Sequence, residues 1–145
     1  MFQFKRGHFQ AWPPGLQTKT PAEGRPALET AVAAVRAQAK PEAELVRALE
    51  RSAGARLADI PVRGEGSGYT VLTTQVGFWA AAQPGALEDV LLAVVNEGGD
   101  ADTNGAVAGA LLGAKHGLDA IPQRWLDRIR GRAEIEALAE ELLKR

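Results

Sequence analysis

The chain has 145 residues, which is enough to bury the core of one domain and short for two. Its 17 basic and 18 acidic residues nearly cancel, and no run of one charge sign points to nucleic acid or to a membrane surface. Cysteine is absent, which excludes disulfides, zinc thiolates and thiol nucleophiles. With no stretch of signal-peptide or membrane-spanning length, we expect a cytoplasmic protein.

Abundant alanine and apolar spacings of three and four predict an all-α fold, a compact helical domain over residues 1–145. Residues 1–24 are the exception, because their aromatic residues and prolines predict an irregular arm that packs its rings on the body. Residues 25–54 predict a helical hairpin, whose second helix begins near Pro41 and stops at Gly54.

Residues 55–69 carry alternate glycines and predict a flexible loop whose backbone could approach a ligand closely. The next stretch, 70–79, is ambiguous, since its valines and threonines favour a strand while its larger apolar residues keep a helical spacing. We expect a helix there. Further helices are expected over 87–95, over 103–116, from Pro122 and around Ile135–Leu142.

The helix expected over 103–116 has glycines at intervals of four, at Gly105, Gly109, Gly113 and Gly117. Each glycine in a helix interior costs about 1 kcal/mol relative to alanine. Close packing by neighbouring helices would offset that cost. The pattern therefore predicts a central helix that is tightly surrounded.

The most informative segment precedes this helix and contains Asp100 and Asp102. On a regular helix, two side chains two residues apart diverge by about 200°. They can converge only if the chain bends, and Gly98 and Gly99 permit such a bend. The two carboxylates and the Thr103 hydroxyl would then be hard oxygen ligands for Mg²⁺, Mn²⁺ or Ca²⁺.

Two simpler or different interpretations stay open at this point. Asp102 or Thr103 could cap the helix, with Asp100 a solvated loop residue. The spacing from Asp100 to Gly105 also matches the first half of an EF-hand loop, but Leu111 stands where a bidentate Glu is needed.

Other residues that could carry chemistry have structural explanations. Trp79 and Trp125 lie in apolar helical patterns and are expected in the core. His116 lies in the last turn of its helix, where the helix dipole favours a cation, so we expect a structural role. No catalytic residue is assigned.

A long ordered motif carries a resemblance to a known family. Residues 95–103 read V-N-E-G-G-D-A-D-T, followed by A-G-A at 108–110, G-A at 113–114, Gly117, and I-P at 121–122 with Trp125. This motif resembles the C-terminal part of the ADP-ribosylglycohydrolases, and within that family it is most similar to the dinitrogenase reductase-activating enzymes. Because the G-S-G-Y run at 66–69 is also similar, the likeness covers residues 64–145.

The resemblance implies an all-α fold with two Mg²⁺ or Mn²⁺ ions, which hold the ribose of an ADP-ribose adduct and activate water for its hydrolysis. It implies the following residue roles: metal ligands Asp100, Asp102 and Thr103; close backbone approach at Gly98 and Gly99; and contacts near the nucleoside end from Ser67, Gly68 and Tyr69.

The chain also departs from that family. Family members carry an N-terminal Thr-Asp-Asp segment with the facing metal ligands and an upstream acid that assists the water, whereas this chain has no Asp-Asp pair. We therefore hold two hypotheses: a hydrolase of ADP-ribosylated proteins whose site a second chain completes, or a non-catalytic module that binds ADP-ribose or one cation. Apolar helix faces left uncovered by such a partial domain also make a homodimer an expectation.

Overall fold

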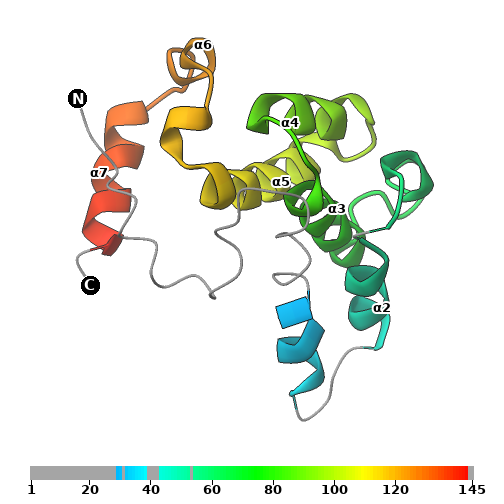
Figure 1. Ribbon diagram of the computed structural model, residues 1–145. Coiled ribbons are helices and arrows are strands. Elements are labelled where there is room, and N and C mark those ends of the chain that lie inside the picture. The colour runs from blue at the N-terminus through cyan, green and yellow to red at the C-terminus, as the bar shows by residue number, and fades with distance from the viewer. Residues whose placement is uncertain (1–28, 31, 39–42, 53, 144–145) are drawn as a thin grey trace.

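The computed structural model describes residues 29–30, 32–38, 43–52 and 54–143 (Figure 1). The irregular arm predicted over residues 1–24 lies outside them, and the predicted hairpin is described only in part. Helical residues at 29–30 and 32–36 come first. The named elements are α2 (Ala43–Ser52), η1 (Leu57–Asp59), α3 (Thr70–Ala82), α4 (Leu87–Asn96), α5 (Ala101–His116), η2 (Leu118–Ala120), α6 (Gln123–Leu126) and α7 (Arg132–Leu143).

The described part of the chain contains helices and no strand, which confirms the predicted all-α fold. The ambiguous stretch 70–79 is helical, as expected, and forms most of α3. None of the helices in this part combines the length and the apolar character that crossing a bilayer requires.

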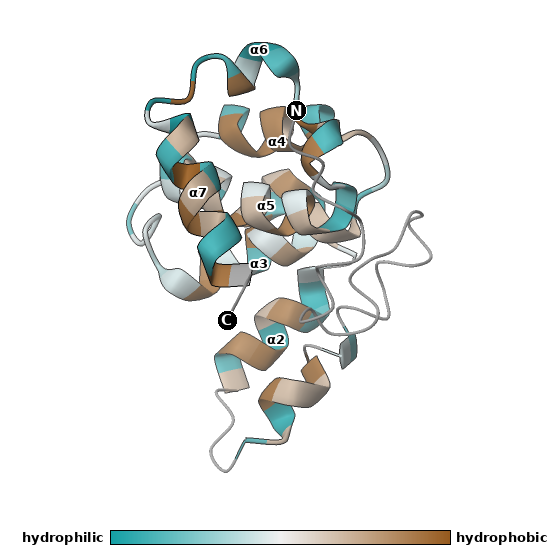
Figure 2. Ribbon diagram, turned by 90° about the vertical axis from the view of Figure 1, so that its left-hand side faces the viewer, coloured by the Kyte–Doolittle hydropathy of each residue, from teal (hydrophilic) through white to brown (hydrophobic). Residues whose placement is uncertain are grey.

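Helix α5 lies between α3 and α4, which are its main neighbours (Figures 1 and 2). The contacts between α3 and α5 follow the same order along both helices. Gly77 faces Val107 and Leu111, and the Lys115 ammonium donates a hydrogen bond to the Ala81 carbonyl at 3.0 Å. The two helices therefore run in the same direction, and their N-terminal ends lie side by side.

Helix α4 runs antiparallel to α5, because its late residue Val95 faces Gly105 while the earlier Leu91 faces Gly109. The core between these helices is apolar, and Figure 2 shows their apolar residues in brown. It is made by Ile60, Val62, Val76, Trp79, Ala80, Leu87, Val90, Val94, Ala108 and Leu112, with Trp125 packed at its edge. Trp79 and Trp125 therefore pack in or against the core, as their apolar helical patterns predict.

The glycines of α5 differ in how closely a neighbouring helix approaches them. A Cβ on Gly105 would lie 3.1 Å from Val95, a tight contact, whereas one on Gly109 would make an ordinary contact of 3.7 Å with Leu91. Gly113 would meet nothing within 4 Å among the described residues, so the expectation of close packing is wrong there. Gly117 ends the helix with φ of +82°, as a C-terminal glycine does.

Candidate metal centre

The turn between α4 and α5 is built on two glycines in the left-handed region. Gly98 has φ of +82° and Gly99 has φ of +66°, a conformation that residues with a side chain rarely adopt. Asp100 follows with φ of −81° and ψ of 60°, outside the helical region. The bend that the sequence requires for Asp100 and Asp102 to converge is therefore present.

The side chains of Asp100 and Asp102 interact with each other at the N-terminal end of α5. A hydrogen bond with the Asp100 side chain, followed by hydrogen bonds from the backbone N–H groups of Thr103 and Asp102, lowers the pKa of the Asp102 carboxyl. Asp102 is exposed and Asp100 half-buried, so the pair is open to solvent. Two carboxylates thus meet on one accessible side of the helix end.

Helix α5 begins at Ala101, two residues before the expected start, and this position corrects the simple capping interpretation. Asp100 is the N-cap residue, and its main-chain carbonyl accepts the Asn104 N–H at 2.9 Å, but its side chain makes no cap hydrogen bond. Asp102 and Thr103 lie inside the first turn. The Asp100 side chain therefore interacts with the side chain of Asp102 and does not cap the helix backbone.

The EF-hand interpretation is wrong as well. Leu111, at the position where a calcium loop needs a bidentate Glu, is 9% exposed and lies in the middle of α5 against Gly77. The segment after Gly105 is a regular packed helix with no return to the aspartates.

The glycine loop before α3 reaches the same place. A Cβ on Gly68 would lie 3.3 Å from Oδ2 of Asp100, so the loop backbone passes directly beside that carboxylate. Ser67 is half-buried, and its N–H donates to the Gly64 carbonyl at 3.2 Å. Tyr69 is 45% exposed and its hydroxyl donates to Oε2 of Glu44 at 2.8 Å. The predicted loop and the predicted aspartates are thus neighbours.

Nothing in the sequence singled out Arg63, whose side chain lies beside Glu97 and Gly98. The Arg63 guanidinium donates from Nε to the main-chain carbonyl of Glu97, and its Nη2 lies 3.3 Å from the Glu97 carboxylate. A Cβ on Gly98 would be 3.8 Å from Nε of Arg63. Because 34 positions separate Arg63 from Glu97, no local spacing could reveal this contact.

The donor set at the turn fits a single divalent cation held by a few protein ligands. Carboxylate oxygens are what Mg²⁺ and Mn²⁺ prefer, and the interacting side chains of Asp100 and Asp102 would offer such oxygens on one side of the turn. Among the residues that the structure describes, no group of three or more His, Cys, Asp or Glu side chains gathers. The chain itself therefore offers two carboxylates and leaves the remaining positions to water or other molecules.

A surface cleft lies away from the aspartates. A cleft of about 710 Å³ is lined by Glu88, Asp119, Arg124 and their neighbours, at the opposite end of α5 from Asp100. None of the predicted site residues lines it. An ion pair between Arg124 and Glu88 crosses its wall.

The imidazole of His116 favours its neutral form, whereas the helix dipole alone would favour the cation. Burial, followed by the positive charge of Lys115, lowers the pKa of its imidazole, and its buried Nε2 has no hydrogen-bond partner among the described residues. The helix dipole favours a cation here, but the loss of hydration and the neighbouring ammonium outweigh it. The side chain is neutral near pH 7 and is far from the aspartates.

Comparison with known proteins agrees with the motif. The family model described as ADP-ribosylglycohydrolase matches residues 12–145. The chain is 41% identical over 76 residues to the ADP-ribosyl-[dinitrogen reductase] glycohydrolase of Rhodospirillum rubrum, a segment covering 52% of this chain and 26% of that protein. It is 35% identical over 79 residues to the ADP-ribosylarginine hydrolase Tri1 of Pseudomonas putida, covering 54% and 21%.

A human relative, the ADP-ribosylhydrolase ARH3, is 37% identical over 57 residues, covering 39% of this chain and 16% of that protein. No solved structure matches the chain. The matched segments therefore span about a quarter or less of the length of these relatives. Since the family model extends over nearly the whole sequence, the chain belongs to the ADP-ribosylglycohydrolase family.

Proposed function

We propose that this chain provides one half of a divalent-cation site for the hydrolysis of ADP-ribosyl linkages, with Asp100, Asp102 and Thr103 as the ligands. The observation that carries the proposal is the turn at Gly98 and Gly99, which brings the interacting side chains of Asp100 and Asp102 to a helix N-terminus beside the backbone of Gly68. Family membership supplies the class of reaction, and the relatives named above are hydrolases of ADP-ribosyl groups.

A Mg²⁺ or Mn²⁺ ion held there would polarise water and orient the ribose hydroxyls of the adduct. The residues of this chain contribute negative charge, hydroxyl oxygen and a close main-chain approach. At Gly98 and Gly99 no side chain covers the main chain next to the proposed ligands, so a substrate could approach it closely. The loop formed by Ser67, Gly68 and Tyr69 lies next to Asp100. We place the nucleoside end of the substrate against this loop.

The cation site can be tested by titrating the chain with Mn²⁺ in a calorimeter. Asp102→Ala is expected to weaken Mn²⁺ binding by about tenfold or more, since it removes one of two carboxylates. Asp102 is exposed, so the melting temperature should change little. Asp89→Ala removes an exposed acid at the other end of α4 and serves as the control. If Asp102→Ala binds Mn²⁺ as tightly as the unaltered chain does, the ligand assignment is wrong.

Hydrolysis is tested separately with ADP-ribosyl-arginine and Mn²⁺. We expect the chain alone to turn over this substrate weakly or not at all, because two carboxylates leave most of the coordination sphere to water. Addition of a chain that carries the family's N-terminal acidic segment should restore turnover. Failure of such a complement to restore it, with both chains folded, would contradict the hydrolase.

A non-catalytic binding module is the second candidate, and the small donor set of the described residues favours it. Calorimetry with ADP-ribose, with and without Mn²⁺, distinguishes the two. If the chain binds ADP-ribose saturably and the added chain with the acidic segment does not restore turnover, the binding module is supported. If turnover is restored, the enzyme is supported.

A further inference from the structure

We infer that Arg63 is a positioning residue, which holds the turn at Gly98 and Gly99 in the shape that brings Asp100 and Asp102 together. The inference rests on the proposed function for the role of the two aspartates, and it adds a residue that lies outside the motif. Three groups of contacts support it.

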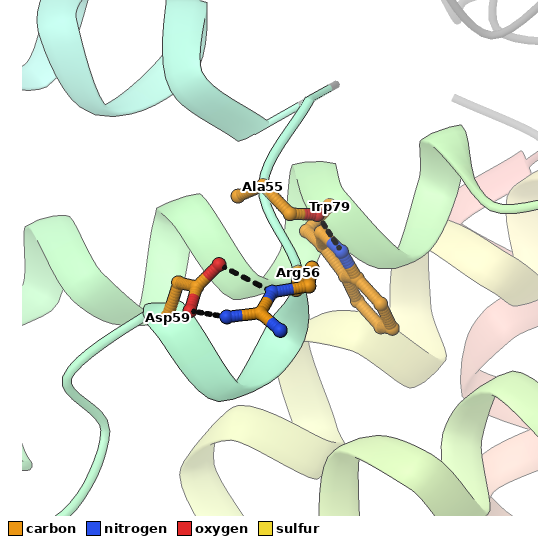
Figure 3. A network of polar contacts seen from close by, with 4 residues as sticks. All are labelled: Ala55, Arg56, Asp59 and Trp79. Carbon is orange, nitrogen blue, oxygen red and sulfur yellow. Dashed lines mark hydrogen bonds and ion pairs between the residues drawn. The ribbon is translucent and has the colours of Figure 1, made fainter.

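The segment that carries Arg63 is fixed to the body of the protein. The indole N–H of Trp79 in α3 donates a hydrogen bond of 3.0 Å to the Ala55 carbonyl, as Figure 3 shows. In the same view the Arg56 guanidinium bonds both carboxylate oxygens of Asp59 across η1, but these side chains are 82% and 50% exposed, so their ion pair adds little to the support. Farther along, Ile60 and Val62 are 3% and 2% exposed and belong to the core. The main chain next to Arg63 is therefore a rigid support.

This support touches the metal turn directly. A Cβ on Gly99 would lie 1.8 Å from the carbonyl oxygen of Val62 and 3.4 Å from Cα of Arg63. Only a glycine can come so close, so the backbones of the two segments pack against each other without a side chain between them. The packing fixes the position of Gly99 but makes no hydrogen bond that would fix the direction of the turn.

The Arg63 side chain supplies that missing polar contact. Its Nε donates to the main-chain carbonyl of Glu97, the residue just after α4, and its Nη2 pairs with the Glu97 carboxylate at 3.3 Å. Carbonyls at the C-terminal end of a helix lack partners within the helix, and a guanidinium there is favoured by the helix dipole. Arg63 thus ties the carbonyl at the end of α4 to the rigid support, one residue before the flexible glycines.

The consequence concerns the aspartates rather than overall stability. The Arg63 side chain is 67% exposed, so its ion pair adds little to the free energy of folding. Its effect is instead on the freedom of a turn that contains two successive glycines. Ligands that are held in place before the ion arrives bind it more tightly, because binding then costs less conformational entropy.

The test compares Arg63→Ala with Arg56→Ala. The control removes an arginine from the same segment whose ion-pair partner is the exposed Asp59, three positions along the chain, rather than a group of the turn. Amide hydrogen exchange is followed without metal in peptides that cover residues 96–104, where Glu97, Gly98 and Asn104 donate backbone hydrogen bonds. Arg63→Ala should speed exchange there by about tenfold, while exchange in α3 and the melting temperature stay as in the control.

The second readout is Mn²⁺ affinity, which Arg63→Ala should lower by about tenfold and Arg56→Ala should leave unchanged. Equal exchange over 96–104 in the two variants would overturn the inference, and so would equal Mn²⁺ affinity where the unaltered chain binds Mn²⁺. If the unaltered chain binds no Mn²⁺ at all, the proposed function fails, while the exchange comparison still decides whether Arg63 holds the turn.

Discussion

Gly99 and Val62 are in backbone contact, so close that a Cβ on Gly99 would lie 1.8 Å from the Val62 carbonyl oxygen. Gly99→Ala must therefore displace the turn or the buried segment behind it, in addition to forcing alanine into φ of +66°. We expect a loss of about 3 kcal/mol or more in the free energy of unfolding, measured by urea denaturation.

The matched control for this substitution is Gly117→Ala. Gly117 has φ of +82° and ψ of 173°, a combination almost restricted to glycine, and a Cβ on it would meet nothing within 4 Å among the described residues, so it reports the backbone strain alone, about 1–3 kcal/mol. Equal losses in the two variants would show that the contact with Val62 is not tight in solution.

The motif around Asp100 could be read from the sequence because its geometry is local. Two acids two residues apart need a bend to converge, and two adjacent glycines permit one, so convergence is one of the interpretations that the spacing allows, and the lowered pKa of Asp102 agrees with it. The support behind the turn could not be read in the same way. Val62 and Arg63 are brought to Gly98 and Gly99 by the packing of helices between them, and no periodicity in the sequence encodes that contact.

Glycines inside the helices give a second prediction. A Cβ on Gly77 would lie 2.9 Å from Val107 and 3.0 Å from Leu111, whereas one on Gly113 would meet nothing within 4 Å among the described residues. Gly77→Ala should therefore destabilise the protein by about 1–3 kcal/mol through overpacking. Gly113→Ala should stabilise it by about 0.5–1 kcal/mol, because alanine is the better helix former.

Both variants are compared by urea denaturation at one pH. A destabilised Gly113→Ala would mean that this face of α5 is covered in solution, by another copy or by part of the chain outside the described residues. A neutral Gly77→Ala would mean that α3 and α5 can separate slightly at no cost, contrary to the contact found.

The same two glycines show where spacing misleads. The regular interval from Gly105 to Gly117 predicts one packed stripe, yet only Gly105 is in tight contact and Gly113 faces open space among the described residues. Gly77, a lone glycine in a helix whose propensities conflict, makes a closer approach to a neighbouring helix than any of them. Which glycine is needed depends on the neighbouring helix, and a single helix's sequence does not contain that information.

The lowered pKa of His116 predicts a dependence of stability on pH. Because the folded state holds the imidazole below its unfolded value of about 6.5, the unfolded chain binds more protons between the two values. This contribution to stability is complete above the unfolded pKa and is lost as pH falls through the folded pKa. His116→Gln should therefore show a smaller drop in unfolding free energy between about pH 7.5 and about pH 5.5 than the unaltered chain.

The comparison uses the same two pH values for both proteins, so that His8 and the carboxylates contribute equally to each. An identical pH dependence in the two would show that His116 titrates normally in the folded state. Asp102, whose pKa is also lowered, titrates below this window and does not interfere.

The last prediction concerns Lys115, which joins the C-terminal ends of α3 and α5. Its ammonium donates to the carbonyls of Ala81 at 3.0 Å and Gln83 at 2.7 Å. Lys115→Met keeps the length of the side chain and removes both bonds, leaving these carbonyls without their charged donor. We expect a loss of about 1–2 kcal/mol in unfolding free energy by urea denaturation.

Arg128→Met, which removes a charge from an exposed position, is the control and should change the free energy of unfolding by less than about 0.5 kcal/mol. Lys115→Met also removes a positive charge beside His116, so the pKa of that imidazole should rise toward its usual value. The loss of stability should then be smaller at about pH 5.5 than at about pH 7.5, because the protonated imidazole is no longer repelled. A loss that matches the control at both pH values would mean that the two helix ends are not joined by this side chain.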